Sequence, residues 1–77
     1  MNELIHYLAR QLVDDPDAVR VERIERDDAI VIQLHVAKED VGKVIGRQGR
    51  IVRALRTLVR ASGARRSERA LLEVAED

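Results

Sequence analysis

The chain contains no cysteine, no phenylalanine and no tryptophan, and its only aromatic residue is Tyr7. The absence of cysteine excludes disulfides and thiol chemistry. A single aromatic side chain leaves little opportunity for base stacking, which is worth about 1–3 kcal/mol per base in proteins that use it. No stretch approaches the roughly 20 consecutive apolar residues of a membrane-spanning helix, and no basic segment followed by an apolar one marks a secretory signal. These absences favour a cytoplasmic protein.

Proline and glycine are also scarce, and no Pro-, Gly- or Ser-rich linker divides the 77 residues. A chain of this length without a linker is expected to form one domain, residues 1–77. Its hydrophobic share of 45% permits a packed core. Domains this small are only marginally stable, however, and many of them oligomerise.

Groups that support catalysis or hold a metal are sparse as well. His6 and His35 lack companions at metal-ligand spacing. Ser62 and Ser67 have no histidine nearby in the pattern. The glycines match neither the phosphate-binding loop of nucleotide hydrolases nor the dinucleotide-binding fingerprint. We therefore expect a protein that is not an enzyme, with no catalytic residue, no metal and no cofactor.

Charge cancels in the sum but is distributed unevenly. Fourteen basic and fourteen acidic residues give a net charge of zero. Nine of the basic residues lie in residues 43–69, where Glu68 is the only acidic residue, so this segment carries +8 and the rest of the chain −8. A concentrated basic segment is typical of proteins that bind polyanions such as nucleic acids. The same asymmetry would also suit a dimer in which basic and acidic surfaces meet.

The first half of the sequence predicts a helix followed by two strands. The helix is capped by Asn2 and ends before Pro16. Its apolar residues recur at helical spacing: Leu4, Ile5, Leu8, Leu12 and Val13. Residues 18–26 form an expected strand, in which Ile24 breaks the alternation and indicates a bulge or an early end. After a turn at Asp27 and Asp28, residues 29–36 alternate clearly, with Ile30, Ile32, Leu34 and Val36 on one face.

The second half predicts two helices and a third strand. One helix begins near Lys38 and is interrupted by Gly46; the next covers residues 50–61 and ends at Gly63. On the latter helix, apolar residues and arginines occupy nearly opposite faces. Residues 68–74 form the last strand, with Ala70, Leu72 and Val74 pointing inward. The order α-β-β-α-α-β predicts an α+β fold, a three-stranded sheet with three helices packed on one face.

The two predicted helices of the second half meet at a turn with two glycines, Gly46 and Gly49, which enclose Arg47 and Gln48. Glycine tolerates positive φ and lets another molecule approach the backbone closely. Between two helices, such a turn can offer main-chain N–H groups to an anion, for which a nucleic-acid phosphate is the obvious candidate. Aliphatic residues on both sides of the turn would offer a wall for bases.

The run Val44-Ile45-Gly46-Arg47-Gln48-Gly49-Arg50-Ile51 within this element order resembles the K-homology (KH) domain in its bacterial, type II arrangement. The continuation over residues 52–59 and the total length are similar to those of the small stand-alone bacterial KH proteins of the KhpA type. The resemblance covers essentially the whole chain. It implies a domain that grips about four nucleotides of single-stranded RNA or DNA, with residues 46–49 on the sugar-phosphate backbone.

The residue pattern and the resemblance together predict a set of RNA-binding residues around the turn. These are Lys43, Val44, Ile45, Gly46, Arg47, Gln48, Gly49, Arg50, Ile51 and Arg53. The resemblance further implies a homodimer with the turn near its interface. It also implies an RNA chaperone that pairs with a larger Jag-type (KhpB) partner and influences cell elongation, cell shape and envelope homeostasis.

A second hypothesis stays open from the sequence. The basic face would be a protein-interaction module that docks onto an acidic face of a twin or partner, with RNA binding secondary. A merely solvated arginine face is a third interpretation. The absence of any acidic residue between Asp40 and Glu68 argues against it, because ordinary exposed helices mix charges of both signs.

Overall fold

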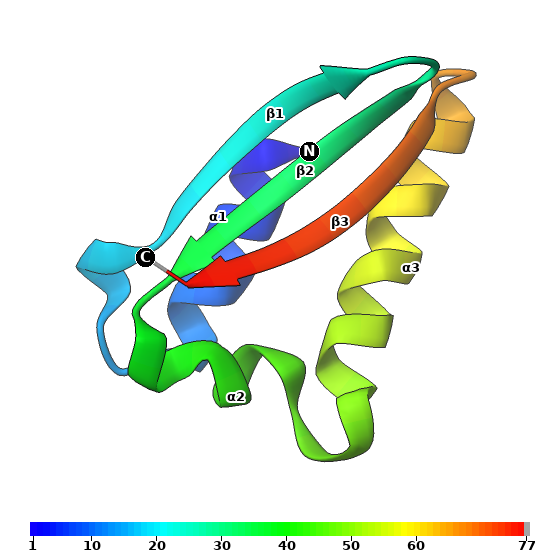
Figure 1. Ribbon diagram of the computed structural model, residues 1–77. Helices are drawn as coiled ribbons and strands as arrows, with labels where there is room; N and C mark the ends of the chain where they lie inside the picture. Colours follow the sequence, from blue (N-terminus) through cyan, green and yellow to red (C-terminus); the bar gives the residue numbers. More distant parts are fainter. Residues whose placement is uncertain (77) are drawn as a thin grey trace.

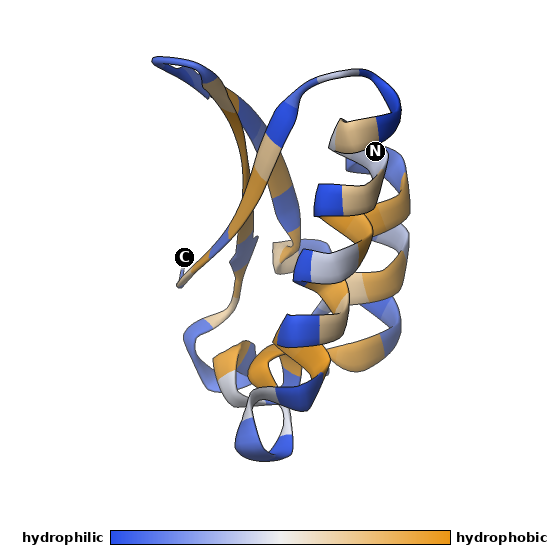
Figure 2. Ribbon diagram, turned by 90° about the vertical axis from the view of Figure 1, so that its right-hand side faces the viewer, coloured by the Kyte–Doolittle hydropathy of each residue, from blue (hydrophilic) through white to orange (hydrophobic). Residues whose placement is uncertain are grey.

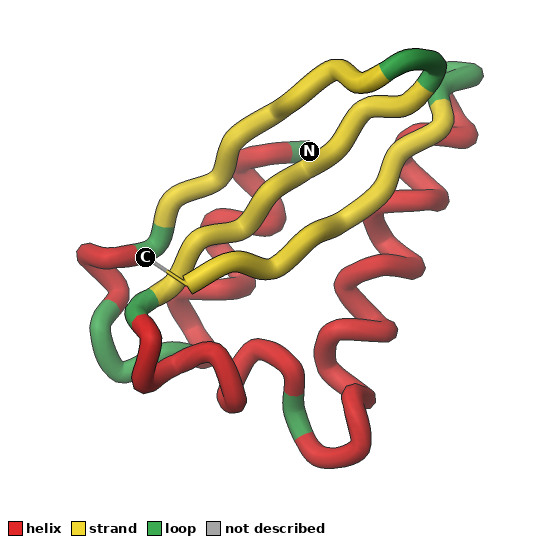
Figure 3. Tube along the Cα trace, in the orientation of Figure 1, coloured by secondary structure: helices red, strands yellow, loops and turns green. Residues whose placement is uncertain are grey.

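The computed structural model describes residues 1–76, which form a three-stranded sheet with three helices on one face (Figure 1). The helices are α1 (Asn2–Leu12), α2 (Val41–Ile45) and α3 (Arg50–Arg65), and the strands are β1 (Arg20–Arg26), β2 (Ala29–Val36) and β3 (Arg69–Glu76). Figure 2 shows sheet and helices as two layers, and Figure 3 shows that the connections between elements are short. The predicted α+β fold and its element order are confirmed.

The central strand of the sheet is β2, which pairs antiparallel with β1 and parallel with β3. The pairing of β1 with β2 runs from Arg20 opposite His35 to Arg26 opposite Ala29 without a skipped residue. The expected bulge or early end at Ile24 is therefore wrong. Ile24 lies opposite Val31, on the face of the sheet that carries no helices. The break in alternation marks an apolar side chain on the outer face.

An ion pair explains how an apolar residue can be buried on that outer face. Val31 is 2% exposed, although no helix covers it. Arg26 pairs with Ala29 and Glu73 with Gln33, each two residues from Val31 along β2, and the two side chains are joined by a 2.9 Å contact from Nη1 to Oε2. Because this contact crosses β2 at the level of Val31, the arginine stem is placed to cover apolar surface while its charged head stays in water.

The core lies between the inner face of the sheet and the helical layer. It is formed by Ile5, Ala9, Val19, Ile32, Leu34, Val36, Val44, Val52, Leu55, Val59, Ala70 and Leu72. The inward face predicted for β2 and β3 is confirmed by these residues. Two members of the predicted apolar helix faces, Leu4 and Leu58, are exposed instead.

Both expected helix ends require correction. Asn2 is the first residue of α1 and not its cap, a position that Met1 occupies. Gly63 does not end the last helix, because α3 continues to Arg65. A Cβ atom added to Gly63 would lie 2.6 Å from the Cβ of Ala70 and 2.8 Å from the carbonyl oxygen of Glu68. Glycine is needed here for the close approach of α3 to β3.

A buried carboxylate connects the segment after α1 to the start of α2. Asp40 is 1% exposed and accepts hydrogen bonds from the backbone N–H groups of Asp14 (3.2 Å) and Asp15 (3.0 Å). The Nζ atom of Lys43 lies 3.4 Å from Asp40 Oδ1 and 3.1 Å from Asp14 Oδ2. Asp40 therefore fixes two segments 25 residues apart in the chain.

Replacement of Asp40 by asparagine is expected to lower stability at neutral pH but not in acid. Burial raises the pKa of Asp40, but the hydrogen bonds from Asp14, Asp15 and Lys43 outweigh it and leave the pKa below the ordinary 3.8. A carboxyl group with a depressed pKa stabilises the fold above its unfolded-state pKa, and this contribution is lost as pH falls through the folded-state pKa. The difference in urea midpoint between wild type and Asp40→Asn should therefore begin to shrink below about pH 4 and disappear only below the folded-state pKa of Asp40. A pH-independent difference would contradict this role.

Candidate nucleic-acid interface

The turn between α2 and α3 is held in a backbone conformation that requires glycine. Gly46 has φ 78° and ψ 172°, a region populated almost only by glycine. A Cβ atom there would also lie 2.6 Å from a side-chain carbon of Ile51. Gly49 has φ 73°, and between the two glycines Gln48 is left-handed as well, with φ 58°. The exposed pair Arg47 and Gln48 is thus presented at the tip of a sharply bent backbone.

Several main-chain amides of the turn are used within it. The N–H of Gly46 donates to the carbonyl of Gly42 at 2.9 Å, and the N–H of Gly49 donates to the carbonyl of Gly46 at 3.1 Å. The N–H of Arg50 donates to the carbonyl of Arg47. The expected offer of main-chain N–H groups to an anion therefore does not extend to Gly46, Gly49 or the first residue of α3. An anion at the turn would meet the chain at Arg47 and Gln48 and not at the glycine amides.

Arg53 braces the turn from the first complete turn of α3. Its Nη2 donates to the carbonyl of Gln48 at 2.9 Å and its Nε to the carbonyl of Gly49 at 3.3 Å. Arg50 donates from Nη2 to the side-chain oxygen of Gln48 at 3.3 Å. A guanidinium carries five N–H donors, so Arg53 can brace the backbone and still offer donors to an anion. Two positive charges are thereby held beside the turn.

The remaining predicted site residues differ in how accessible they are. Ile45 and Ile51 are half-buried on either side of the turn. Val44 is 0% exposed and belongs to the core, so it supports this wall from behind. The Nζ atom of Lys43 lies between the carboxylates of Asp14 and Asp40. Its hydrogen bond and ion pair with Asp14, and then those with Asp40, raise the pKa of Lys43.

A groove leads from this turn along α3. It has a volume of about 300 Å³ and is lined by Arg53, Arg56 and Arg60 of α3 and by Leu71 and Leu72 of β3. β3 is one of the two outer strands of the sheet, so one of its edges has no neighbouring strand among residues 1–76. Figure 2 shows hydrophilic stretches of α3 turned toward that edge. Arg53 belongs to both features, because it braces the turn and lines the groove.

Four of the five residues that line the groove were not in the predicted site. Arg56 and Arg60 continue the face of Arg53 at intervals of three and four residues, and this helical spacing is a signal that the sequence does contain. Leu71 and Leu72 supply the aliphatic strand edge, which no local pattern distinguishes from the rest of the last strand. Their position depends on how closely α3 approaches β3.

Two other kinds of site find no support in the described part of the chain. Residues 1–76 contain no group of three or more His, Cys, Asp or Glu side chains arranged to hold a metal ion. Over the same residues, none of the helices is both long and apolar enough to cross a membrane.

Comparison with known proteins finds relatives over nearly the whole chain. The family model for the KhpA/KhpB KH domain matches residues 2–74. The chain is 53% identical to RNA-binding protein KhpA of Treponema pallidum, over 94% of this chain and 90% of that protein. It is 50% identical to RNA-binding protein KhpA of Caldanaerobacter subterraneus subsp. tengcongensis (96% and 99% covered) and 45% identical to that of Listeria monocytogenes (99% and 100%). With a family match and relatives that extend over nearly its full length, the chain belongs to the KhpA/KhpB family of KH domains.

Proposed function

We propose that this protein is a non-enzymatic, cytoplasmic binder of single-stranded RNA. The observation that carries the proposal is the continuity of the turn at residues 46–49 with the arginine-lined groove through Arg53. Membership of the KhpA/KhpB family supports it, as do relatives named RNA-binding protein KhpA.

The turn would bind the sugar-phosphate backbone. Arg47 and Gln48 are exposed at its tip, and the guanidinium groups of Arg50 and Arg53 lie beside it. Charge-assisted hydrogen bonds from guanidinium to phosphate are roughly twice as strong as neutral ones. Lys43, at the edge of this group and paired with two carboxylates, would add a weaker and more distant positive potential.

The groove would hold the bases. Leu71 and Leu72 form its apolar wall, Ile45 and Ile51 extend apolar surface to the turn, and arginines form the opposite side. With no aromatic residue in the groove, guanidinium planes are the flat surfaces on which bases can stack. Modest affinity and loose sequence preference are therefore proposed for an isolated domain.

A salt titration tests the proposal. Affinity for a ten-nucleotide single-stranded RNA, measured by fluorescence anisotropy, should fall by about 0.7 log unit per log unit of salt for each phosphate neutralised. A duplex of the same sequence serves as the control, because paired bases cannot enter a single-strand groove. Affinity that does not respond to salt, or a preference for the duplex, would contradict the proposal.

A second role is proposed for the helical layer. Leu4 and Tyr7 of α1 and Leu58 of α3 are large apolar side chains that remain exposed, with Tyr7 at 61%. Such residues are common in protein interfaces. We propose a homodimer, a complex with a Jag-type (KhpB) partner, or both. Through that assembly the protein would act as an RNA chaperone in cell elongation, cell shape and envelope homeostasis.

A further inference from the structure

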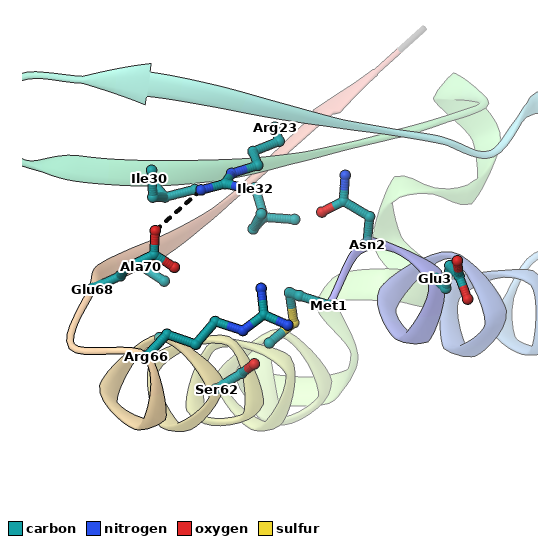
Figure 4. Close-up of a pocket in the computed structure, with 11 residues that line it drawn as sticks. Met1, Asn2, Glu3, Arg23, Ile30, Ile32, Ser62, Arg66, Glu68 and Ala70 are labelled. Atoms are coloured by element: carbon teal, nitrogen blue, oxygen red, sulfur yellow. Dashed lines mark hydrogen bonds and ion pairs between the residues drawn. The ribbon is translucent and has the colours of Figure 1, made fainter.

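A second hollow lies on the opposite side of α3 from the groove. It is enclosed by the beginning of α1, the end of α3 and the inner face of the sheet, and its volume is about 400 Å³ (Figure 4). Sites for small organic molecules occupy about 300–1,000 Å³. The floor of this hollow, called the Arg66 hollow below, is apolar and consists of Ile30, Ile32 and Ala70. Its rim is polar and includes Arg23, Arg66, Glu68 and Ser62.

The two arginines at the rim differ in what they contact. Arg23 is paired with Glu68 at 3.1 Å from Nη2 to Oε2. The guanidinium of Arg66 has no hydrogen-bond or ion-pair partner within residues 1–76. Figure 4 shows it extended from the end of α3 toward Met1. A planar cation whose five donors meet no partner in the described residues therefore lines the same hollow as the apolar floor.

The overall charge of the hollow indicates which part of a nucleotide suits it. Arg23 and Arg66 are balanced by Glu3 and Glu68, which line the same hollow. A bare phosphate gains little from a site of balanced charge, whereas a nucleobase presents apolar faces and an edge of neutral donors and acceptors. A base on the apolar floor could stack under Arg66 and donate from an amino group to the carboxylate of Glu68.

The Arg66 hollow and the groove are neighbours along the same helix. Arg60 of the groove precedes Arg66 by six residues, or about 9 Å along the axis of α3. Only the tight contact of Gly63 with Ala70 and the loop that follows Arg65 separate the two features. Passage from one side of the helix to the other adds about 10 Å, the diameter of a helix with its side chains. Stacked nucleotides are about 3.4 Å apart along a strand, so roughly five nucleotides would cross the combined distance over the end of α3.

We propose that the Arg66 hollow accepts a base of an RNA strand that already occupies the groove, so that the bound length exceeds the four nucleotides of a single KH groove. This inference rests on the RNA binding proposed above and extends it to a second contact. The strand passes from Arg60 over the end of α3, and its next bases meet Arg66 and the apolar floor.

The test compares oligoadenylates of five and ten nucleotides by fluorescence anisotropy. Wild type is expected to bind the longer strand more tightly. Arg66→Ala should weaken binding of the ten-nucleotide strand about fivefold or more, the lower end of what one lost base stack removes, and leave the five-nucleotide strand unaffected. Ser62→Leu, which fills the hollow without changing charge, should have the same selective effect.

Arg65→Ala is the matched control, since it removes the same charge one residue away and Arg65 does not line the hollow. An equal loss with Arg65→Ala and Arg66→Ala would overturn the inference, because a general positive field would then account for both. Equal affinity of wild type for the two lengths, or no effect of Ser62→Leu, would also overturn it and leave the groove proposal intact. Failure of wild type to bind either strand would refute both.

Discussion

The double substitution Arg47→Asp and Gln48→Asp is expected to abolish binding of single-stranded RNA by a protein that remains folded. Both side chains are exposed, and aspartate tolerates the left-handed conformation of residue 48, which has φ 58°. Loss of one hydrogen bond to a charged group removes about 1.5–3 kcal/mol, or about 10- to 150-fold in Kd. Two carboxylates at the proposed phosphate position add repulsion, so this range is a lower bound.

The chain contains its own control for this experiment. Arg10 and Gln11 are the same residue pair, also exposed, but they lie on α1 and not at the turn. Arg10→Asp with Gln11→Asp changes the net charge by the same amount, and circular dichroism melting verifies the fold of both variants. Anisotropy with a ten-nucleotide RNA should show loss only for the pair at 47 and 48. Equal loss in both variants, or retained binding by the turn variant, would remove the turn from the mechanism.

Sedimentation of the same two variants separates RNA binding from self-association. If the aspartates at 47 and 48 abolish RNA binding and leave the sedimentation coefficient unchanged, the turn serves RNA alone. If they also dissociate a dimer, the turn lies at or near the interface and the two proposed roles share a surface. The two variants can be compared directly because the aspartate pair at residues 47 and 48 and the pair at residues 10 and 11 change the net charge equally.

Sequence periodicity predicts an element correctly where the pattern within that one segment determines which of its side chains are buried. The alternation in residues 29–36 specifies the inner face of β2, since every second side chain of a strand points to the same side. Periodicity wrongly predicts a bulge at Ile24, because Ile24 lies beside Val31, whose other neighbour is Leu71, in an apolar group on the outer face formed by residues far apart in the chain.

Tertiary contacts also explain the roles of single residues that sequence patterns assign incorrectly. Glycine near the end of a helical pattern usually marks its end, yet Gly63 lies inside α3 because β3 packs against it. Asp40 has a conventional place in a first helical turn. Asp40 also accepts hydrogen bonds from Asp14 and Asp15, which lie 26 and 25 residues away in the chain, and no pattern around residue 40 predicts these bonds.

In the candidate site, too, the local sequence predicts one feature, the turn, and does not predict the cavities that depend on tertiary packing. The position of the turn follows from the spacing of Gly46 and Gly49 between two helical segments, as the sequence predicts. The groove and the Arg66 hollow, by contrast, are assembled from α3 and strands that are distant in sequence. No periodicity of a single segment encodes such a volume, because it depends on the distance between packed elements.

Replacement of Gly63 by alanine is expected to destabilise the protein severely. The new Cβ would lie 2.6 Å from the Cβ of Ala70 and 2.8 Å from the carbonyl oxygen of Glu68, and neither neighbour is the end of a flexible side chain. Overpacking commonly removes about 1–3 kcal/mol and sometimes more, and backbone contact places Gly63→Ala at or above the upper end. At about 0.05–0.15 kcal/mol per residue, the whole domain has only about 4–12 kcal/mol to lose. Urea denaturation measures the change.

The same glycine-to-alanine change at position 42 is expected to raise stability and not to lower it. Nothing lies within 4 Å of a Cβ added to Gly42 in α2, so alanine should stabilise that helix by about 0.5–1 kcal/mol. Similar stability of the two alanine variants would disprove the packing role of Gly63. Adding Ala70→Gly to Gly63→Ala should restore part of the stability, because it removes one close contact and leaves the Glu68 carbonyl. Whatever clash remains must push α3 away from β3, and the groove that these two elements enclose should then bind RNA more weakly even in the rescued protein.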